Sequence, residues 1–331
     1  MTVPTVGPEI PVAVRTADAR FTGLADFPFD PHYVEVQNPY ADGTLRMHHV
    51  DEGPRDAPVV LMAHGEPTWS YVYRKMIPVF SAAGLRAIAV DHIGFGRSDK
   101  LTRPAHYTFG SHIEWMRELV IALDLRDITI VCQDWGGPIA MGVLAREPDR
   151  FSRVVAGNTM LHTAEPELAG RLDWAVHQSG AEDSTVSKML LDWMRFTHRA
   201  AEFAPSLPVS ASTVRGVSSE VAAAYDAPFP SEWHLGGVRQ FPLLIPVTTT
   251  DPGAVINRAT WKALAEWRGA LLTLFGDSDP PTRGWAEIFQ ERVPGARGQP
   301  HRTLERAGHF WQEDCGAEAA EFIVEWIEAT A

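Results

Sequence analysis

Asp134 stands at the centre of a predicted strand-to-helix turn whose residue types could support covalent catalysis. An apolar, β-branched run at residues 128–131 precedes it, and a helix-like stretch follows at residues 139–145. Cys132 and Gly136, two residues to either side, are small, as the sharp turn of a nucleophile elbow requires. A serine that attacks saturated carbon forms a stable ether, whereas an aspartate forms an ester that water can cleave. The sequence therefore predicts that Asp134 displaces a leaving group from an alkyl carbon and that water then hydrolyses the ester.

An acid and a base follow downstream in the order that such a nucleophile needs. Asp279 comes just after the apolar run 271–276, and His309 lies shortly before a predicted C-terminal helix at residues 318–329. We expect His309 to take a proton from water and Asp279 to hold the imidazole in one tautomer. Asp277, in the same acidic loop, is the alternative acid.

Two backbone amides are predicted to stabilise the oxyanion of the hydrolysis step. One is the amide of Glu66, in the loop His64-Gly65-Glu66-Pro67 that follows the apolar run 59–63, and the other is that of Trp135. These are the positions from which a nucleophile elbow of this kind draws its oxyanion donors. The side chain of Glu66 is expected near the path of the water, with a solvent-exposed turn residue as the alternative.

Trp135, directly after the nucleophile, indicates which leaving group the site could accommodate. A departing halide is large, weakly hydrated and negative, and an indole N–H in a dry pocket can stabilise it without acting as a nucleophile. A second converging donor is expected from a separate helical segment, where Trp174 and Trp193 are the choices. We favour Trp193, and ordinary core packing is the competing interpretation for either ring.

The elements that must position these residues follow an α/β pattern. Short apolar runs at 59–63, 87–90, 128–132 and 154–157 are typical of strands buried on both faces of a parallel sheet, and helix-like segments at 112–123 and 138–145 lie between them. The alternation predicts a mostly parallel, doubly wound α/β sheet, preceded by a hairpin at 33–36 and 45–50. Catalytic groups of such sheets lie beyond the carboxyl ends of the strands.

The alternation stops where a cap is predicted. Residues 163–231 contain helix-like pieces at 184–198 and 218–225, and we interpret them as a helical cap inserted into a core formed by residues 1–162 and 232–331. Residues 1–13 are expected to form a flexible tail.

Composition narrows the classes of partner. The chain has 331 residues, 45% hydrophobic and 21% charged, with a net charge of −13 and no basic stripe, which argues against nucleic acid. No apolar run approaches the roughly 20 residues needed to cross a bilayer, and no secretory signal is evident. Two cysteines cannot build a disulfide framework. We expect a cytoplasmic protein without metal or organic cofactor, as a monomer or a weak oligomer.

At these residues the chain resembles a haloalkane dehalogenase of the subfamily whose founding members act on short chlorinated alkanes. The matching motifs are His64-Gly65-Glu66-Pro67-Thr68-Trp69-Ser70-Tyr71, Gly94-Phe95-Gly96-Arg97-Ser98-Asp99-Lys100, Gln133-Asp134-Trp135-Gly136-Gly137, Ala227-Pro228-Phe229-Pro230, Gln240-Phe241-Pro242 and Ala307-Gly308-His309-Phe310. The resemblance implies an α/β-hydrolase fold with a helical cap, Asp279 as the acid, Trp193 as the second halide donor and Phe241 in the substrate pocket. Pro138 and the pair Pro280-Pro281 depart from the family pattern and bear on substrate size.

The expected reaction converts a haloalkane into an alcohol, a halide and a proton. An epoxide hydrolase is the nearest alternative, but it needs two cap tyrosines to bind the epoxide oxygen, and the predicted cap has one, Tyr225, beside two tryptophans. A fluoroacetate-type dehalogenase needs arginines that Gly136-Gly137-Pro138 do not provide. A silent receptor of the same fold would have lost one of the three catalytic positions, all of which are filled.

Overall fold

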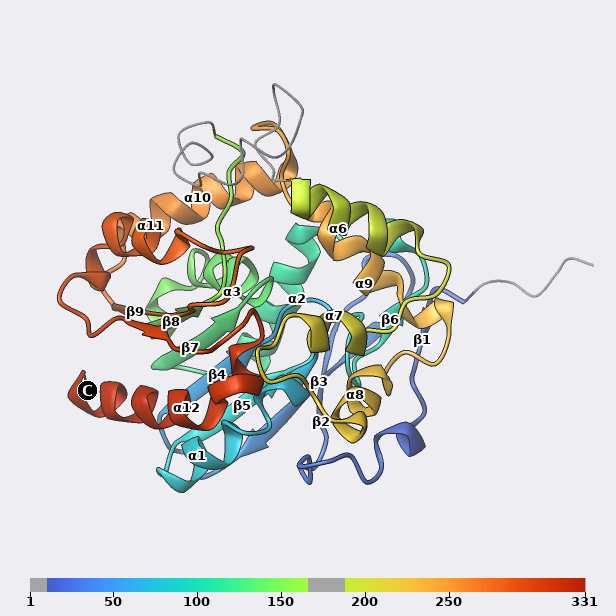
Figure 1. Cartoon of the computed structure of the whole chain (residues 1–331), viewed down its shortest axis with the longest axis horizontal. Coiled ribbons are helices and arrows are strands. Elements are labelled where there is room, and N and C mark those ends of the chain that lie inside the picture. The colour runs from blue at the N-terminus through green and yellow to red at the C-terminus, as the bar shows by residue number, and fades with distance from the viewer. Residues whose placement is uncertain (1–10, 166–187, 331) are drawn as a thin grey trace, which may run out of the picture.

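The computed structural model describes residues 11–165 and 188–330, and within them a mixed sheet forms the centre of the molecule (Figure 1). Its eight strands lie in the order β10-β9-β8-β7-β4-β5-β3-β2 among these described residues. The strands are β2 His32–Gln37, β3 Thr44–Glu52, β4 Val59–Ala63, β5 Arg86–Val90, β7 Ile128–Gln133, β8 Phe151–Gly157, β9 Ala270–Gly276 and β10 Arg302–Leu304.

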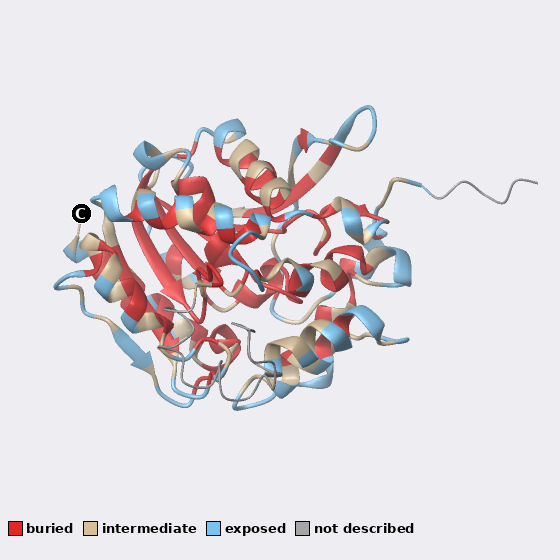
Figure 2. Ribbon diagram, turned by 90° about the horizontal axis from the view of Figure 1, so that it is seen from above, coloured by how far each residue is buried: buried red, intermediate tan, exposed pale blue. Residues whose placement is uncertain are grey.

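The central strands form where the sequence is continuously apolar. Every residue of β4, β5 and β7 is buried, because helices cover both faces of the sheet (Figure 2). β4, β5, β7, β8, β9 and β10 are mutually parallel. β2 and β3 form the predicted antiparallel hairpin at the opposite edge. The doubly wound α/β prediction is therefore confirmed.

Two groups of helices enclose the sheet. α1 Ile77–Ala82 packs on α12 Trp311–Ala329, and α2 Phe109–Ala122 packs on α3 Gly136–Leu144 and α10 Pro252–Glu266. Figure 1 shows α12 and α1 below the strands and α10 and α11 (Trp285–Arg292) above them. Because these strands are parallel, their carboxyl ends share one edge of the sheet, the edge at which the strands end. The loops after β4, β7 and β9 meet there.

Further helices lie beside this edge. α6 Lys188–Arg199 packs on α9 Gly236–Gln240, and α7 Ser206–Ala211 packs on α8 Ser219–Asp226. α6, α7 and α8 fall inside the predicted cap range. The predicted boundaries at residues 163 and 231 stay a prediction, because residues 166–187 lie outside the described residues.

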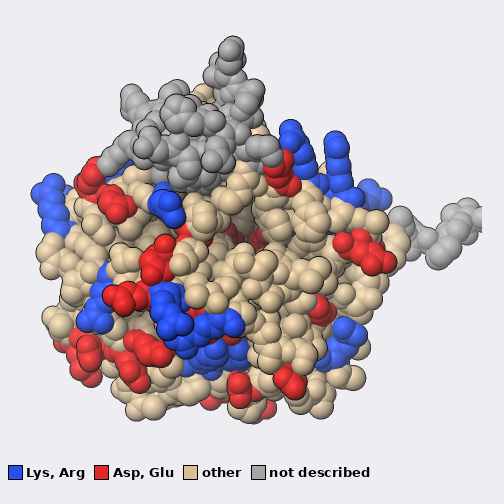
Figure 3. Space-filling view, viewed as in Figure 1, with Lys and Arg blue, Asp and Glu red and all other residues tan. Residues whose placement is uncertain are grey.

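The predicted flexible tail is too long at its inner end. Ala13 and Val14 form β1, which pairs antiparallel with β6, Lys100–Leu101, and the Thr102 amide donates to the carbonyl of Val12 at 3.0 Å. Backbone hydrogen bonds, which need no apolar pattern, hold this segment. No helix within residues 11–165 and 188–330 is long and apolar enough to cross a membrane. On the face in Figure 3, acidic side chains lie near the basic ones around a broad uncharged area.

Candidate active site

The turn between β7 and α3 presents Asp134 to a cavity. Asp134 has a left-handed φ of 50°, which is unfavourable for a residue with a Cβ and is found where the surrounding structure enforces it. A Cβ on Gly65 would overlap the Asp134 side chain, and one on Gly136 would overlap the carbonyl oxygen of Ala63. These two glycines therefore let the loop after β4 approach the turn closely enough to contact the carboxyl group.

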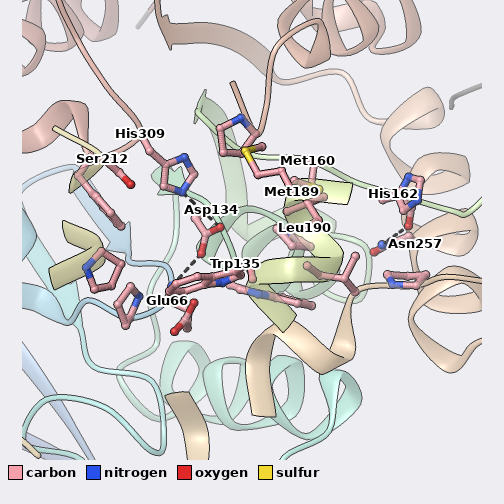
Figure 4. Close-up of a pocket in the computed structure, with 18 residues that line it drawn as sticks. Glu66, Asp134, Trp135, Met160, His162, Met189, Leu190, Ser212, Asn257 and His309 are labelled. Atoms are coloured by element: carbon pink, nitrogen blue, oxygen red, sulfur yellow. Dashed lines mark hydrogen bonds and ion pairs between the residues drawn. The ribbon is translucent and has the colours of Figure 1, made fainter. Parts of the chain in front are cut away.

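The two oxygens of the Asp134 carboxyl group have different partners (Figure 4). The backbone N–H of Glu66 donates to Oδ1 at 2.7 Å. Nε2 of His309 lies 3.5 Å from Oδ2. The structure thus brings together the predicted nucleophile, the predicted base and one of the two predicted oxyanion donors. The second, the amide of Trp135, follows Asp134 directly at the start of α3.

His309 is held from its other side by Asp279. Nδ1 of the imidazole lies 2.9 Å from Oδ1 of Asp279, which is buried, and the hydroxyl of Thr282 donates to the second oxygen. Asp277 is exposed and accepts the backbone N–H groups of Arg306 and Ala307 at 2.9 and 3.3 Å. Of the two acids in this loop, only Asp279 reaches the imidazole.

The two carboxylates decide the charge of His309. Burial by itself would lower its pKa, but the charges of Asp279 and Asp134 and their hydrogen bonds raise the pKa above that of an ordinary imidazole. In the site without substrate, the two neighbouring carboxyl groups therefore favour the protonated form of His309.

Glu66 and Trp193 contact each other across the cavity. Burial and the nearby charge of Asp134 raise the pKa of Glu66 well above its usual range, and a hydrogen bond from the Trp193 side chain opposes this rise. Trp193 comes from α6, so a helix of the predicted cap range reaches the loop after β4. Trp174, the alternative indole, lies outside the described residues.

Trp135 lines the cavity, but Phe241 does not. Phe241 belongs to the short 3-10 helix Phe241–Leu244 and packs edge-to-face behind Trp135, with ring centroids 5.2 Å apart. It is buried against Phe95 and His112 as well. The expectation that Phe241 lines the pocket is thus wrong: the aromatic cluster behind Trp135 takes up its ring, and its contribution is to support the indole.

Three polar side chains that sequence reasoning did not assign to the site position the His309 loop. Asn158, just after β8, donates to the carbonyls of Gly308 and His309 at 2.8 and 3.0 Å and accepts the Gly276 amide at 2.8 Å. Gln133 donates to the carbonyl of His309 at 3.2 Å. Asp314 accepts the Gly308 amide at 2.9 Å. Asn158 directly follows the buried strand β8 and Gln133 ends the buried strand β7. This placement is the sequence signal that could have assigned them to the site.

The cavity in front of Asp134 measures about 210 Å³ and is mainly apolar. Among the described residues, those that line it besides the ones above are Pro67, Pro138, Met160, His162, Met189, Leu190, Pro208, Ser212, Ile245, Pro246, Asn257, Pro281 and Phe310. In the part of the chain that the structure describes, no cluster of His, Cys, Asp and Glu side chains is arranged to hold a metal ion.

A nucleophile elbow after a central parallel strand, followed by an acid and a histidine on later loops, defines the α/β-hydrolase class. The family model described as "alpha/beta hydrolase fold" matches residues 58–280.

Within this class the chain belongs to the haloalkane dehalogenases. It is 45% identical to a haloalkane dehalogenase of Psychrobacter cryohalolentis, over 95% of this chain and 97% of the relative. It is 43% identical to one from Mycobacterium marinum, over 95% and 99% of the two chains. A solved tetrameric haloalkane dehalogenase of Paraglaciecola agarilytica is 34% identical, with a TM-score of 0.81 over 94% of this chain and 97% of the relative.

Proposed function

We propose that this protein hydrolyses haloalkanes to an alcohol, a halide and a proton, with Asp134 as nucleophile, His309 as base and Asp279 as the acid that orients it. The observation that carries the proposal is the carboxylate of Asp134 at the elbow, 3.5 Å from an imidazole that Asp279 holds from behind. Family membership supports the choice of a carbon–halogen bond.

In the first step an Asp134 oxygen attacks the carbon that bears the halogen. The new oxygen–carbon bond forms as the carbon–halogen bond breaks, and the halide leaves with the electron pair. The indole N–H groups of Trp135 and Trp193 stabilise the halide. They act in an apolar cavity, where a hydrogen bond to an anion is stronger than in water.

The second step hydrolyses the alkyl ester. Esterification removes the negative charge of Asp134, one of the two charges that raise the pKa of His309. The imidazole can then release its proton and act as the base that activates water. Water attacks the ester carbonyl as His309 takes its proton, and the amides of Glu66 and Trp135 stabilise the oxyanion. The bond between the carbonyl carbon and the alkyl oxygen then breaks, and the proton on His309 passes to the leaving oxygen to give the alcohol. Asp134 is left as a carboxyl group, which passes its proton to His309. The cycle consumes one haloalkane and one water and requires no cofactor.

Bromide and proton release from 1,2-dibromoethane, followed with a pH indicator, tests the activity. A single turnover in heavy-oxygen water tests the mechanism: the label should enter the carboxylate of Asp134 and be absent from the first alcohol formed. Label in that first alcohol would instead show direct attack by water and contradict the ester intermediate.

The inventory of donors argues against an epoxide as substrate. Tyr225, the tyrosine of the predicted cap, is buried and donates its hydroxyl to Glu313. No tyrosine lines the cavity within the described residues. An epoxide oxygen at Asp134 would therefore lack the phenol donors that its ring opening requires.

Replacing Trp193 by Phe should weaken halide binding by about tenfold or more, since a hydrogen bond to a charged group is lost. Quenching of the remaining tryptophan fluorescence by bromide measures the affinity. Trp233→Phe is the matched control, because Trp233 is 47% exposed and outside the cavity lining. A bromide affinity lowered by Trp174→Phe and left unchanged by Trp193→Phe would assign the second donor to Trp174.

Bromide affinity should also fall as pH rises through the raised pKa of Glu66. The protonated carboxyl group is neutral and can release the Trp193 indole to the halide, whereas the ionised group retains the indole and repels the anion. Bromide quenching over a pH series measures this. In Glu66→Gln the Glu66-dependent part of the slope should vanish, leaving the titration of His309. An unchanged slope in this variant would show that Glu66 does not control halide binding.

A monomer in the cytoplasm stays our expectation. The solved relative from Paraglaciecola agarilytica is a tetramer, so sedimentation of the purified protein is the measurement that decides the oligomeric state.

A further inference from the structure

One end of the cavity is polar and has no task in the proposed reaction. His162, shortly after β8, and Asn257, on α10, line it on the side away from Asp134 and Glu66 (Figure 4). The two residues are 6% and 4% exposed. Nε2 of His162 and Oδ1 of Asn257 are buried without a hydrogen-bond partner. Buried polar atoms are normally paired, so two atoms that face one cavity with free hydrogen-bonding capacity indicate a site for a polar ligand.

The hydrogen bonds that are present define what this ligand must offer. Nδ2 of Asn257 donates to the backbone carbonyl of His162 at 2.7 Å. This bond determines the orientation of the amide, so the free atom is the acceptor Oδ1. Burial lowers the pKa of His162 to about 4, and a neutral imidazole has one N–H donor and one acceptor nitrogen.

A neutral group that both donates and accepts fits these atoms. A hydroxyl can donate its one proton to Oδ1 of Asn257 and accept a second hydrogen bond from the N–H of a neutral His162. A carboxylate has no proton for the Asn257 oxygen. An ammonium group would lose its hydration here without gaining a counter-charge, because the two acidic side chains of the lining, Glu66 and Asp134, lie toward the other end of the cavity.

We propose that His162 and Asn257 form a subsite for the hydroxyl group of a haloalcohol whose halogen-bearing carbon lies at Asp134. This inference rests on the proposed dehalogenase activity and narrows its substrate class. A haloalcohol is also what a terminal dihaloalkane becomes after losing its first halogen, so the subsite would favour conversion of the dihalide to the diol.

The test compares terminal bromoalcohols with bromoalkanes of equal carbon number across a series of chain lengths. Because the distance from Asp134 to the subsite is fixed, a hydroxyl should help only at one or two lengths. At those lengths His162→Leu should lower kcat/KM for the bromoalcohol, relative to the bromoalkane, by about five- to tenfold, as expected for the loss of one hydrogen bond. Met160→Leu, at another position of the lining, should change both substrates alike.

His162→Leu should fold normally. It removes an unpaired polar atom and keeps the backbone carbonyl that Asn257 binds, so the thermal midpoint should be maintained. Bromo methyl ethers of matched length can accept from His162 but cannot donate to Asn257, so they should gain less than the alcohols. If they gained as much as the alcohols, the role of Asn257 would be overturned.

The possible failures are distinct. Absence of bromide release from every substrate would contradict the proposed function itself. Both substrate series could instead release bromide, with the same ratio of kcat/KM for bromoalcohol over bromoalkane in the parent protein and in His162→Leu at every length. That result would overturn the subsite alone and would leave water as its occupant.

Discussion

Asp134→Ala should abolish turnover of bromoalkanes, with a loss of about 10⁴-fold or more, as expected when a covalent nucleophile is removed. The variant retains the cavity, the imidazole and both indoles, but no atom remains that can form the ester. Bromide release, measured over many hours at high enzyme concentration, sets the upper limit on the residual turnover rate of this variant. Residual turnover near the parent rate would mean that His309 activates water directly against the alkyl carbon, and the mechanism proposed here would be wrong.

Two controls separate chemistry from folding in this experiment. Asp42→Ala changes an exposed aspartate between β2 and β3 and should leave kcat/KM unchanged. Fluorescence quenching by bromide should persist in Asp134→Ala, because the halide donors are retained. It should even strengthen, since the negative charge facing the anion is gone.

His309→Gln should stop the reaction after its first step. Alkylation of Asp134 needs no base, whereas hydrolysis of the ester does, and the loss of a general base lowers the rate of such a step by about 10²- to 10⁴-fold. We expect a burst of bromide equal to the enzyme concentration, followed by slow turnover. Mass spectrometry should then find one alkyl group on the peptide that carries Asp134.

Two control variants test whether the alkyl group is attached to Asp134 and whether it accumulates only when His309 is absent. His234→Gln, a change at a histidine outside the cavity lining, should show continuous turnover without adduct. The double variant Asp134→Ala, His309→Gln should show neither burst nor adduct. Steady turnover of His309→Gln at the parent rate, without accumulation of ester, would assign the base to another group.

Much of the scaffold could be predicted because its signals are local. The apolar runs that became β4, β7 and β9 are continuous, and strands of that kind are stable only between two layers of helices. Asp134 could be identified from neighbours within two residues, because the tight turn of an elbow leaves no space for large side chains on either side of the nucleophile. The edge strand β10 was missed, because it is short and exposed and carries no such pattern.

The errors and open choices concern side chains whose surroundings come from distant segments. Phe241 matched a motif, but whether its ring faces substrate or supports Trp135 depends on the space left by Phe95 and His112. Asp277 and Asp279 are two residues apart in one turn, and only the path of that turn brings Asp279 to the imidazole.

The sequence by itself determined which chemistry is available: a carboxylate in place of a hydroxyl, followed by an acid, a histidine and an adjacent indole, in an order that a parallel sheet can gather at one edge. Only the tertiary structure decided which groups share the cavity. Trp193 reaches Glu66 from α6, and Asn257 meets His162 across 95 residues of chain. The reason is physical: a backbone turn is encoded by its nearest neighbours, whereas the partners of a buried polar atom depend on how separate elements pack.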